Sequence, residues 1–254
     1  MTAYLQVTGL NKRFGGLQAL RDCSFTVGQG RITCLVGPNG AGKTTIFNAI
    51  TGFLVPDTGH VEFQGRSLDG QSPQQIVHHG IARTFQNLRL FADLTARDNV
   101  LAGMQDHVGE GPLGAIFRPF HTARALAAKQ DAAMAVLAHV GLQDRASALV
   151  RNLSYGEQKL LCIARILATG AELLLLDEPT SGLSGAALTE VMALLRRLQA
   201  EGKTLLVVEH NTRVVQQIAD DVLFLHHGHL LAHGSPAEII ADPKLAEIYF
   251  GGTL

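Results

Sequence analysis

Residues 37–45 read Gly37-Pro38-Asn39-Gly40-Ala41-Gly42-Lys43-Thr44-Thr45, and the predicted fold follows from this stretch. The apolar run at residues 32–36 before it predicts a buried strand, and residues 44–50 after it predict a helix. Between them, glycines allow the backbone to curl so that successive N–H groups point inward. A loop of this kind at the start of a helix favours anion binding.

The same stretch fits G-x-x-x-x-G-K-[ST], the Walker A pattern, through Gly37, Gly42, Lys43 and Thr44. We expect Lys43 to reach the β- and γ-phosphates of ATP, and the Thr44 hydroxyl to hold Mg²⁺. A glycine-rich turn with an accidental lysine is the alternative, but it leaves the flanking strand and helix unexplained. The predicted nucleotide contacts are therefore Gly37, Pro38, Asn39, Gly40, Ala41, Gly42, Lys43, Thr44 and Thr45.

A second apolar run, at residues 173–176, predicts a strand that ends in two acids, Asp177 and Glu178. An aspartate at a strand end can hold Mg²⁺, as in a Walker B element. The glutamate after it can polarise an attacking water as general base. Pro179 keeps the strand from continuing, so both acids are expected at the edge of the sheet.

Two further side chains are candidates because of their positions. His210 follows a buried strand at residues 204–208, and the carboxyl ends of parallel strands carry the ligands. A histidine there is more often structural, yet it shares this edge with Lys43 and the two acids. Phe14 precedes two glycines in a predicted turn, where an aromatic ring can stack on adenine. The alternative for Phe14 is an ordinary core residue.

Composition excludes several other classes of protein. The 254 residues carry a net charge of −1, so no basic excess indicates a nucleic-acid partner. No apolar run approaches the ~20 residues of a membrane-spanning helix. The N-terminal residues lack the pattern of a signal peptide. Cys23, Cys34 and Cys162 have no metal or redox spacing and are predicted to be buried thiols. We expect a cytoplasmic protein.

The rest of the chain alternates short strands and helices. Residues 4–36 predict antiparallel strands, and residues 61–65 predict an edge strand of a hairpin. Residues 87–152 predict an inserted helical lobe that includes a Gly/Pro-rich loop at 108–120. The other predicted elements are residues 73–80 (helix), 81–85 (strand), 98–104 and 122–140 (helices), 153–169 and 186–199 (helices), 222–225 with 229–232 (hairpin) and 236–241 (helix).

Ser154 begins the helix at residues 153–169, and two interpretations of it remain open. Ser154 and Glu157 fit the S-x-x-E capping box, which is a complete structural explanation. A free serine hydroxyl at a helix N-terminus next to a glycine is also typical of an anion site.

Together these segments resemble the nucleotide-binding subunit of an ATP-binding cassette (ABC) transporter over nearly the full length. The order carries the resemblance: Phe14, the Walker A stretch, Gln86, the signature Leu-Ser-Tyr-Gly-Glu-Gln at 153–158, Asp177 with Glu178, and His210. It implies an α/β fold with a P-loop (RecA-like) nucleotide-binding core, an antiparallel β-subdomain and an inserted α-helical subdomain. The implied limits are residues 1–86 with 153–254 for the core and its C-terminal extension, and 87–152 for the helical subdomain.

The resemblance also implies roles for individual residues. Lys43, Gln86, Glu178 and His210 would be catalytic. Thr44, Gln86 and Asp177 would hold Mg²⁺. Ser154 and Gly156 would contact the ATP of a partner subunit, while the other site residues serve this chain's own nucleotide.

A narrower resemblance is to the branched-chain amino acid import ATPases of the LivG type. It rests on Arg-Thr-Phe-Gln-Asn-Leu-Arg-Leu-Phe at residues 83–91, on Tyr155 in the signature, and on residues 117–119 and 246–251. Relatives for urea, amides or aromatic acids look alike, so the solute stays open. The run at residues 181–184 departs from the family pattern, because Ser184 stands where an acid or an asparagine is usual.

The implied partners are a second ATP-binding subunit (identical or paralogous) in a head-to-tail dimer, two membrane permease subunits and, indirectly, a periplasmic or surface solute-binding protein. The chain would be peripheral on the inner face of the cell membrane. An export ATPase of the lipopolysaccharide type is one alternative. Another is a non-transport cassette acting on DNA or ribosomes, but the long heptad insertions or tandem cassettes of that class are not visible.

A surface for the membrane subunits is predicted just after Gln86. Apolar side chains alternate there with Arg89, Asp93 and Arg97, a mixture that suits a groove for a short helix. Arg89 and Phe91 are the favoured contacts, whereas Leu94 is interpreted as packing inside the lobe. The apolar residues of this surface are Leu88, Leu90, Phe91 and Leu94.

Overall fold

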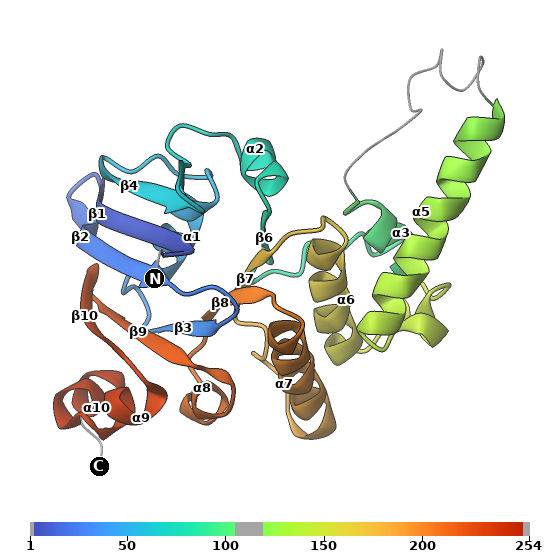
Figure 1. The fold of residues 1–254 in the computed structure, drawn as a ribbon. Coiled ribbons are helices and arrows are strands. Elements are labelled where there is room, and N and C mark those ends of the chain that lie inside the picture. Colours follow the sequence, from blue (N-terminus) through green and yellow to red (C-terminus); the bar gives the residue numbers. More distant parts are fainter. Residues whose placement is uncertain (1–2, 105–118, 251–254) are drawn as a thin grey trace. The chain divides into compact units, whose positions relative to one another are not determined.

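The computed structural model describes residues 3–104 and 119–250, and the chain divides into two compact units (Figure 1). The core unit comprises Met1–Gln86, Glu172–Gly182 and Met192–Leu254, and the helical unit comprises Asn87–Ala171 and Leu183–Val191. The predicted loop at residues 108–120 lies outside the described residues as far as residue 118. No helix in the described ranges has the length and apolar character needed to cross a bilayer.

The main sheet of the core unit has six strands in the order β10-β9-β3-β8-β7-β6. All neighbours pair in parallel except β10, which forms the predicted hairpin with β9. β3, β7 and β8 are buried along their whole length, which explains their largely apolar sequences. The strands are β3 (Ile32–Val36), β6 (Ile81–Arg83), β7 (Leu173–Asp177), β8 (Thr204–Val208), β9 (Asp221–His226) and β10 (His229–Gly234).

The second sheet of the core unit is antiparallel, in the order β2-β1-β4-β5. Its strands are β1 (Leu5–Phe14), β2 (Leu17–Val27), β4 (Thr58–Phe63) and β5 (Arg66–Ser67). β4 forms a hairpin with β5, as predicted for residues 61–65, but the prediction that this strand lies at the edge of the sheet is wrong, because β4 also pairs with β1. β5 covers only two residues, too few for a recognisable strand pattern.

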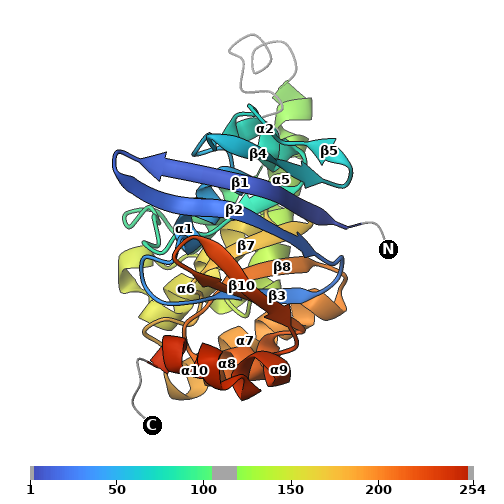
Figure 2. The same cartoon turned by 90° about the vertical axis from the view of Figure 1, so that its left-hand side faces the viewer.

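Helix α1 (Lys43–Ile50) lies between the two sheets (Figure 2). Its fully buried Ile46, Phe47 and Ile50 share one core with residues from both sheets, such as Val7 and Leu35. Burial of each such side chain contributes about 1.5–3 kcal/mol. The first residue of α1, Lys43, is thereby held at the carboxyl end of β3.

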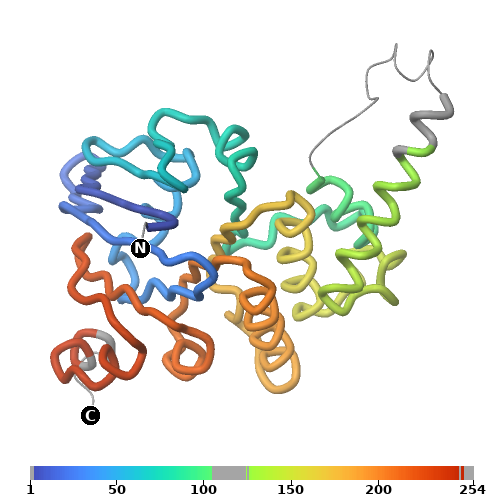
Figure 3. Tube along the Cα trace, viewed as in Figure 1, coloured from blue at the N-terminus to red at the C-terminus, as the bar shows by residue number. Residues whose placement is uncertain are grey.

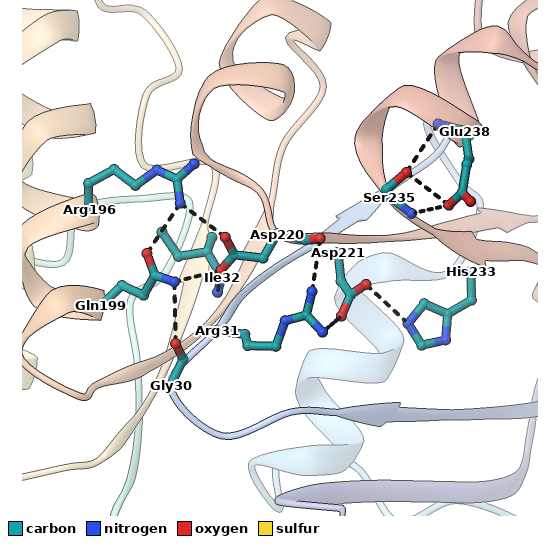
Figure 4. Close-up of polar contacts among 10 residues, drawn as sticks. All are labelled: Gly30, Arg31, Ile32, Arg196, Gln199, Asp220, Asp221, His233, Ser235 and Glu238. Atoms are coloured by element: carbon teal, nitrogen blue, oxygen red, sulfur yellow. Dashed lines mark hydrogen bonds and ion pairs between the residues drawn. The ribbon is translucent and has the colours of Figure 1, made fainter.

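A polar network holds the opposite, amino ends of the parallel strands (Figure 4). The carboxylate of Asp220 accepts hydrogen bonds from Ile32 N at 2.8 Å, Gln199 Nε2 at 2.7 Å and Arg196 Nη1 at 3.1 Å. Asp220 precedes β9, and Ile32 begins β3. The network therefore aligns the starts of two neighbouring strands and joins them to the end of α7 (Gly185–Ala200).

The C-terminal part of the core unit contains three helices, one before and two after the hairpin of β9 and β10, which Figure 3 shows along the chain path. These are α8 (Thr212–Ile218), α9 (Pro236–Ala241) and α10 (Pro243–Phe250). α9 matches its predicted range, and Ser235 caps it in a complete capping box with Glu238. α10 was not predicted. The short helix α2 (Pro73–His78) precedes β6 in the same unit and ends two residues before the predicted position.

The helical unit contains α3 (Ala96–Leu101), α5 (Pro119–His139), α6 (Tyr155–Leu167) and the short 3-10 helices η1 (Gln143–Arg145) and η2 (Val150–Asn152). α3 begins earlier than predicted because Thr95 caps it, its hydroxyl accepting from Asp98 N at 3.1 Å. α5 begins at Pro119 rather than residue 122, since proline is tolerated in the first helical turn.

Candidate active site

The loop between β3 and α1 depends on its glycines. Gly37 has φ +145°, Gly40 +78° and Gly42 +110°, conformations that side chains disfavour. A Cβ on Gly37 would lie 2.0 Å from the carbonyl oxygen of Leu225, and one on Gly42 would lie 2.7 Å from that of Ala19. A Cβ on Gly40 would meet nothing within 4 Å. The loop therefore packs tightly against the sheets at both ends and has open space at its middle.

Lys43 is enclosed by the loop that precedes it. Its Nζ donates to the carbonyl oxygens of Gly37 at 2.7 Å and Pro38 at 3.0 Å. Burial lowers the pKa of Lys43, and the nearby carboxylates of Glu178 and Asp177 oppose this change without cancelling it. These two hydrogen bonds use two of the three ammonium donors, so a third can serve a phosphate oxygen.

The residues predicted from distant parts of the sequence meet in one cleft of about 680 Å³ within the core unit. This volume is in the usual range for small-molecule sites. An adjoining hollow of about 500 Å³ adds His210, together with Gln86 and Glu178. The lining of the main cleft includes Phe14, Lys43, Thr44, Gln86, Asp177 and Glu178. Its further members Arg21 and His227 were not predicted, because each comes from a turn or strand with no motif.

Asp177 ends β7 as a buried carboxylate paired with an arginine that the sequence motifs missed. Arg83 Nη2 lies 3.1 Å from Asp177 Oδ2, and its Nη1 donates to Asn48 Oδ1 at 2.5 Å. Its guanidinium also lies against the rings of Phe47 and Phe85. Burial raises the pKa of Asp177, and Arg83 partly offsets the rise. The sequence signal that could have indicated this partner is the charged Arg83 at the end of an apolar strand.

Glu178 is half-buried between two polar neighbours. Gln86 Nε2 donates to its Oε2 at 3.3 Å, and His210 Nδ1 lies 3.8 Å from its Oε1. Its backbone N–H donates to the carbonyl of Val208 at 3.0 Å. The structure thus brings two predicted residues, Gln86 and His210, from two other segments within reach of the Glu178 carboxylate. A carboxylate placed in this way can accept a proton from water.

The polar groups of the loop and cleft fit a nucleoside triphosphate with Mg²⁺. The loop would offer N–H groups and Lys43 to phosphate oxygens, and its middle, at Gly40, has open space. The Thr44 hydroxyl and the Asp177 carboxylate both line the cleft and would supply the oxygen ligands that Mg²⁺ prefers. The tight contacts at Gly37 and Gly42 leave the backbone itself, rather than side chains, facing such a ligand.

Phe14 is not a core residue, since 49% of it is exposed. It lines the cleft, and Lys12 Nζ lies 5.7 Å from the centre of its ring. Lys12 is itself held by Asp57 at 2.8 Å, so the contact restrains the ring. A half-exposed aromatic ring that lines the cleft can stack on a base.

Ser154 and Gly156 belong to the helical unit. Ser154 Oγ accepts from Glu157 N at 3.3 Å, and Glu157 Oε2 accepts from Ser154 N at 2.7 Å, so the capping box is complete. A Cβ on Gly156 would lie 3.1 Å from Cβ of Ala187, which explains a small residue at this position. Both residues therefore have a structural role, whatever else they do.

The profile described as ABC transporter matches residues 20–181 of this sequence. The chain belongs to the ABC transporter family. The high-affinity branched-chain amino acid transport ATP-binding protein LivG of Salmonella typhimurium is 38% identical to it over 97% of both chains. The corresponding protein BraF of Pseudomonas aeruginosa is 36% identical, again over 97% of both.

Solved structures agree with this family assignment. A nucleotide-free ATP-binding cassette from an ABC transporter matches with a TM-score of 0.85 and 30% identity, covering 98% of this chain and 99% of that one. An ABC transporter cassette in its ADP conformation matches equally, with a TM-score of 0.85 and 30% identity over 99% of this chain and 100% of that one. The predicted family, fold class and ATPase class are thereby confirmed, and the cassette is one that binds nucleotide.

The exposed ring of Phe14 makes adenine stacking testable. Phe14→Ala should weaken ATP binding to the cassette by roughly 1–3 kcal/mol, the range for base–aromatic stacking. Titration of the purified chain with ATP measures the effect. Leu231→Ala is the control, because Leu231 is also exposed and apolar but does not line the cleft. Equal affinities in the two variants would remove Phe14 from the nucleotide site.

Substitution of Ser154 distinguishes its role as a helix cap from a role in the signature. Ser154→Ala should cost about 1 kcal/mol of stability as a lost cap. The hydrogen bonds from Ser154 and the guanidinium of Arg145 outweigh burial and lower the pKa of Glu157. The stability that Glu157 contributes through the capping box is therefore fully present above the unfolded carboxyl pKa of about 4.3. It is lost as the pH falls through the lower pKa of the folded state.

If Ser154 also has a role in the signature, Ser154→Ala should have a second effect, a defect in ATP-driven dimerisation. The experiment compares dimer formation with ATP in Glu178→Gln and in the Glu178→Gln, Ser154→Ala double variant, each with its unfolding curve. A double variant that is less stable yet dimerises as well as the single one leaves Ser154 as a helix cap alone.

Proposed function

We propose that this cassette hydrolyses ATP with Mg²⁺ and powers the import of branched-chain amino acids. The observation that carries the hydrolysis is the gathering of Lys43, Asp177, Glu178 and Gln86 around one cleft. The solute follows from the curated relatives that match over 97% of both chains and are named for branched-chain amino acid transport.

Each side chain has a defined task in this proposal. Lys43 binds the phosphates, and the Thr44 hydroxyl and Asp177 carboxylate, with Gln86, hold the Mg²⁺. When bound, the metal neutralises charge that develops on the phosphates. Glu178 accepts the proton of the attacking water, and its neighbours at 3.3 Å (Gln86) and 3.8 Å (His210) orient the carboxylate.

The cassette would act as a head-to-tail dimer. Asn39, Gly40 and Thr44 are exposed, so one wall of the cleft is open to another protein. A second ATP-binding subunit, identical or paralogous, would cover it, with Ser154 and Gly156 of each chain facing the nucleotide of the other.

The membrane subunits would contact the surface after Gln86. Phe91 is 50% exposed, and its backbone N–H and C=O are both bound by the buried side chain of Asn99, at 2.9 and 3.0 Å. The interpretation of Leu94 as internal packing is wrong, since 42% of it is exposed. Leu94 therefore joins Phe91 as an apolar contact.

Arg165 completes this surface. Its Nη1 donates to the carbonyl of Arg89 at 2.6 Å, and its guanidinium lies 5.3 Å from the centre of the Phe91 ring. These contacts hold a segment that exposes the apolar side chains of Phe91 and Leu94, which suits a docked helix. In the core unit, a largely apolar groove of about 360 Å³ with Phe53 and Phe85 in its wall offers a second such surface.

Uptake into reconstituted vesicles tests the function. The full chain, assembled with permease subunits and a solute-binding protein, should import labelled leucine, isoleucine or valine only with ATP and Mg²⁺. Competition by urea, an amide and an aromatic acid at equal concentration ranks the related solutes. Uptake of one of these in place of the branched-chain amino acids would replace the solute but keep the importer. ATP-driven export, or association of the chain with ribosomes or DNA rather than with the permease, would overturn the proposal.

In the same vesicles, Phe91→Ala should lower transport and weaken association with the permease, while ATP binding by the isolated chain stays intact. The loss should reach about tenfold, as when one apolar anchor of an interface is truncated. Leu126→Ala is the matched control, an equally exposed apolar residue of the helical unit at 54%. Unchanged transport and pull-down with Phe91→Ala would remove this surface from coupling.

A further inference from the structure

The backbone of Glu178 is strained. Its φ is +51°, in the left-handed region that a side chain disfavours, and Pro179 follows directly. Such conformations persist only where surrounding contacts impose them, and they gather at functional sites. The contacts around residues 178–181 should therefore reveal what holds the proposed base in place.

Three consecutive residues at the end of β8 contact this turn. Val208 accepts from Glu178 N at 3.0 Å, and His210 Nδ1 lies 3.8 Å from Glu178 Oε1. Between them, Glu209 Oε1 accepts from both the N–H and the hydroxyl of Thr180, at 3.2 and 2.7 Å. Residues 208–210 at the end of β8 thus hold the turn that carries Glu178.

Glu209 is the unusual residue of these three. Its exposed fraction is 0%, and that of Thr180 is 5%. Burial raises the pKa of Glu209, and the hydrogen bonds from Thr180 counteract the rise. Burying a carboxyl without a full ion pair is costly, and the role of Glu209 in hydrolysis is otherwise undefined. Its carboxylate accepts two hydrogen bonds from Thr180, the residue two positions after Glu178, and it also interacts with His210.

We propose that Glu209 is a positioning residue for catalysis: its carboxyl fixes Thr180, which keeps the Glu178 backbone left-handed and the Glu178 carboxylate at the cleft. This inference rests on the proposed role of Glu178. Glu209 touches neither ATP nor water in this role, and it acts only through the turn at residues 178–180. Losing it should affect the rate of hydrolysis and leave nucleotide binding unaltered.

The test uses the full chain assembled with its permease, with kcat and KM for ATP hydrolysis and the melting temperature measured for each variant. Thr180→Val removes the hydroxyl donor, and Glu209→Leu removes the acceptor. Both should lower kcat by roughly ten- to hundredfold, the range for a small misplacement of a reacting group. KM and ATP affinity should stay within about twofold. Thr180→Ser and Glu209→Gln keep a donor and an acceptor and should restore the rate.

Thr33→Val is the matched control for Thr180→Val. Thr33 is a fully buried threonine of the same unit whose hydroxyl makes no hydrogen bond among the described residues, so its kcat should be unchanged. Should Glu209→Leu fail to fold, Thr180→Val decides alone. A lower melting temperature with normal kcat in Thr180→Val would make the contact merely structural and overturn the proposal.

A Glu178→Gln background separates this inference from the proposed function. In single-turnover assays, Thr180→Val should slow hydrolysis in the wild-type background but not further in Glu178→Gln, because both act through one carboxylate. Equal slowing in both backgrounds would overturn the positioning role. If Glu178→Gln itself left hydrolysis unaltered, the assignment of the base would be wrong, and the positioning role would be overturned with it.

Discussion

Replacing Glu178 by glutamine should slow ATP hydrolysis about 10²–10⁴-fold, the range for a lost general base, while ATP binding persists. Glutamine has the shape of glutamate, so the contacts with Gln86 and His210 can survive. An amide cannot take up the proton of the attacking water. The loop around Lys43 is unaltered by the change, so the phosphates should still bind.

The measurement is steady-state phosphate release by the assembled protein, with ATP affinity determined in parallel. Glu172→Gln is the control. Glu172 also lies in the core unit, where it accepts a hydrogen bond from Tyr4 Oη at 2.8 Å, but it does not line the cleft. Near-normal turnover of a folded, dimeric Glu178→Gln variant would contradict the assignment of the base.

Gly37→Ala should be the most damaging single change to the loop. The added Cβ would lie 2.0 Å from the Leu225 carbonyl oxygen, and φ at this position is +145°. Overpacking typically costs 1–3 kcal/mol, and a side chain in a left-handed conformation about 1–2, so the free energy of unfolding should fall by about 2–5 kcal/mol. ATP binding should fall with it, because the loop cannot close around Lys43.

Denaturant unfolding and ATP titration measure these two losses. Gly65→Ala is a sharp control, because Gly65 also has a positive φ, +75°, but a Cβ there would meet nothing within 4 Å. It should show only the conformational cost of about 1–2 kcal/mol. Equal destabilisation by the two changes would mean that the loop can shift away from β9, and that the close approach does not define it.

The sequence by itself determined the loop, the acids and their order. Gly37, Lys43 and Asp177 belong to short contiguous patterns in which each residue's neighbours predict its strand or helix. Parallel strands place their carboxyl ends at one edge, so a cleft containing Lys43, Asp177 and Glu178 could be anticipated. The comparisons confirmed the family that this order indicated. Helix caps such as Ser154 with Glu157 were equally predictable, because their partners are three residues apart.

Only the tertiary structure decided which side chains support these residues. Arg83 reaches Asp177 across 94 positions of sequence, and Glu209 reaches Thr180 across 29. No local pattern specifies such pairs, because they depend on the strand order β8-β7-β6 and on which strand ends become neighbours. The left-handed backbone conformation of Glu178 could not be predicted from the sequence for the same reason. A non-glycine residue adopts it only when contacts from another strand impose it, and those contacts exist only once the sheet has formed.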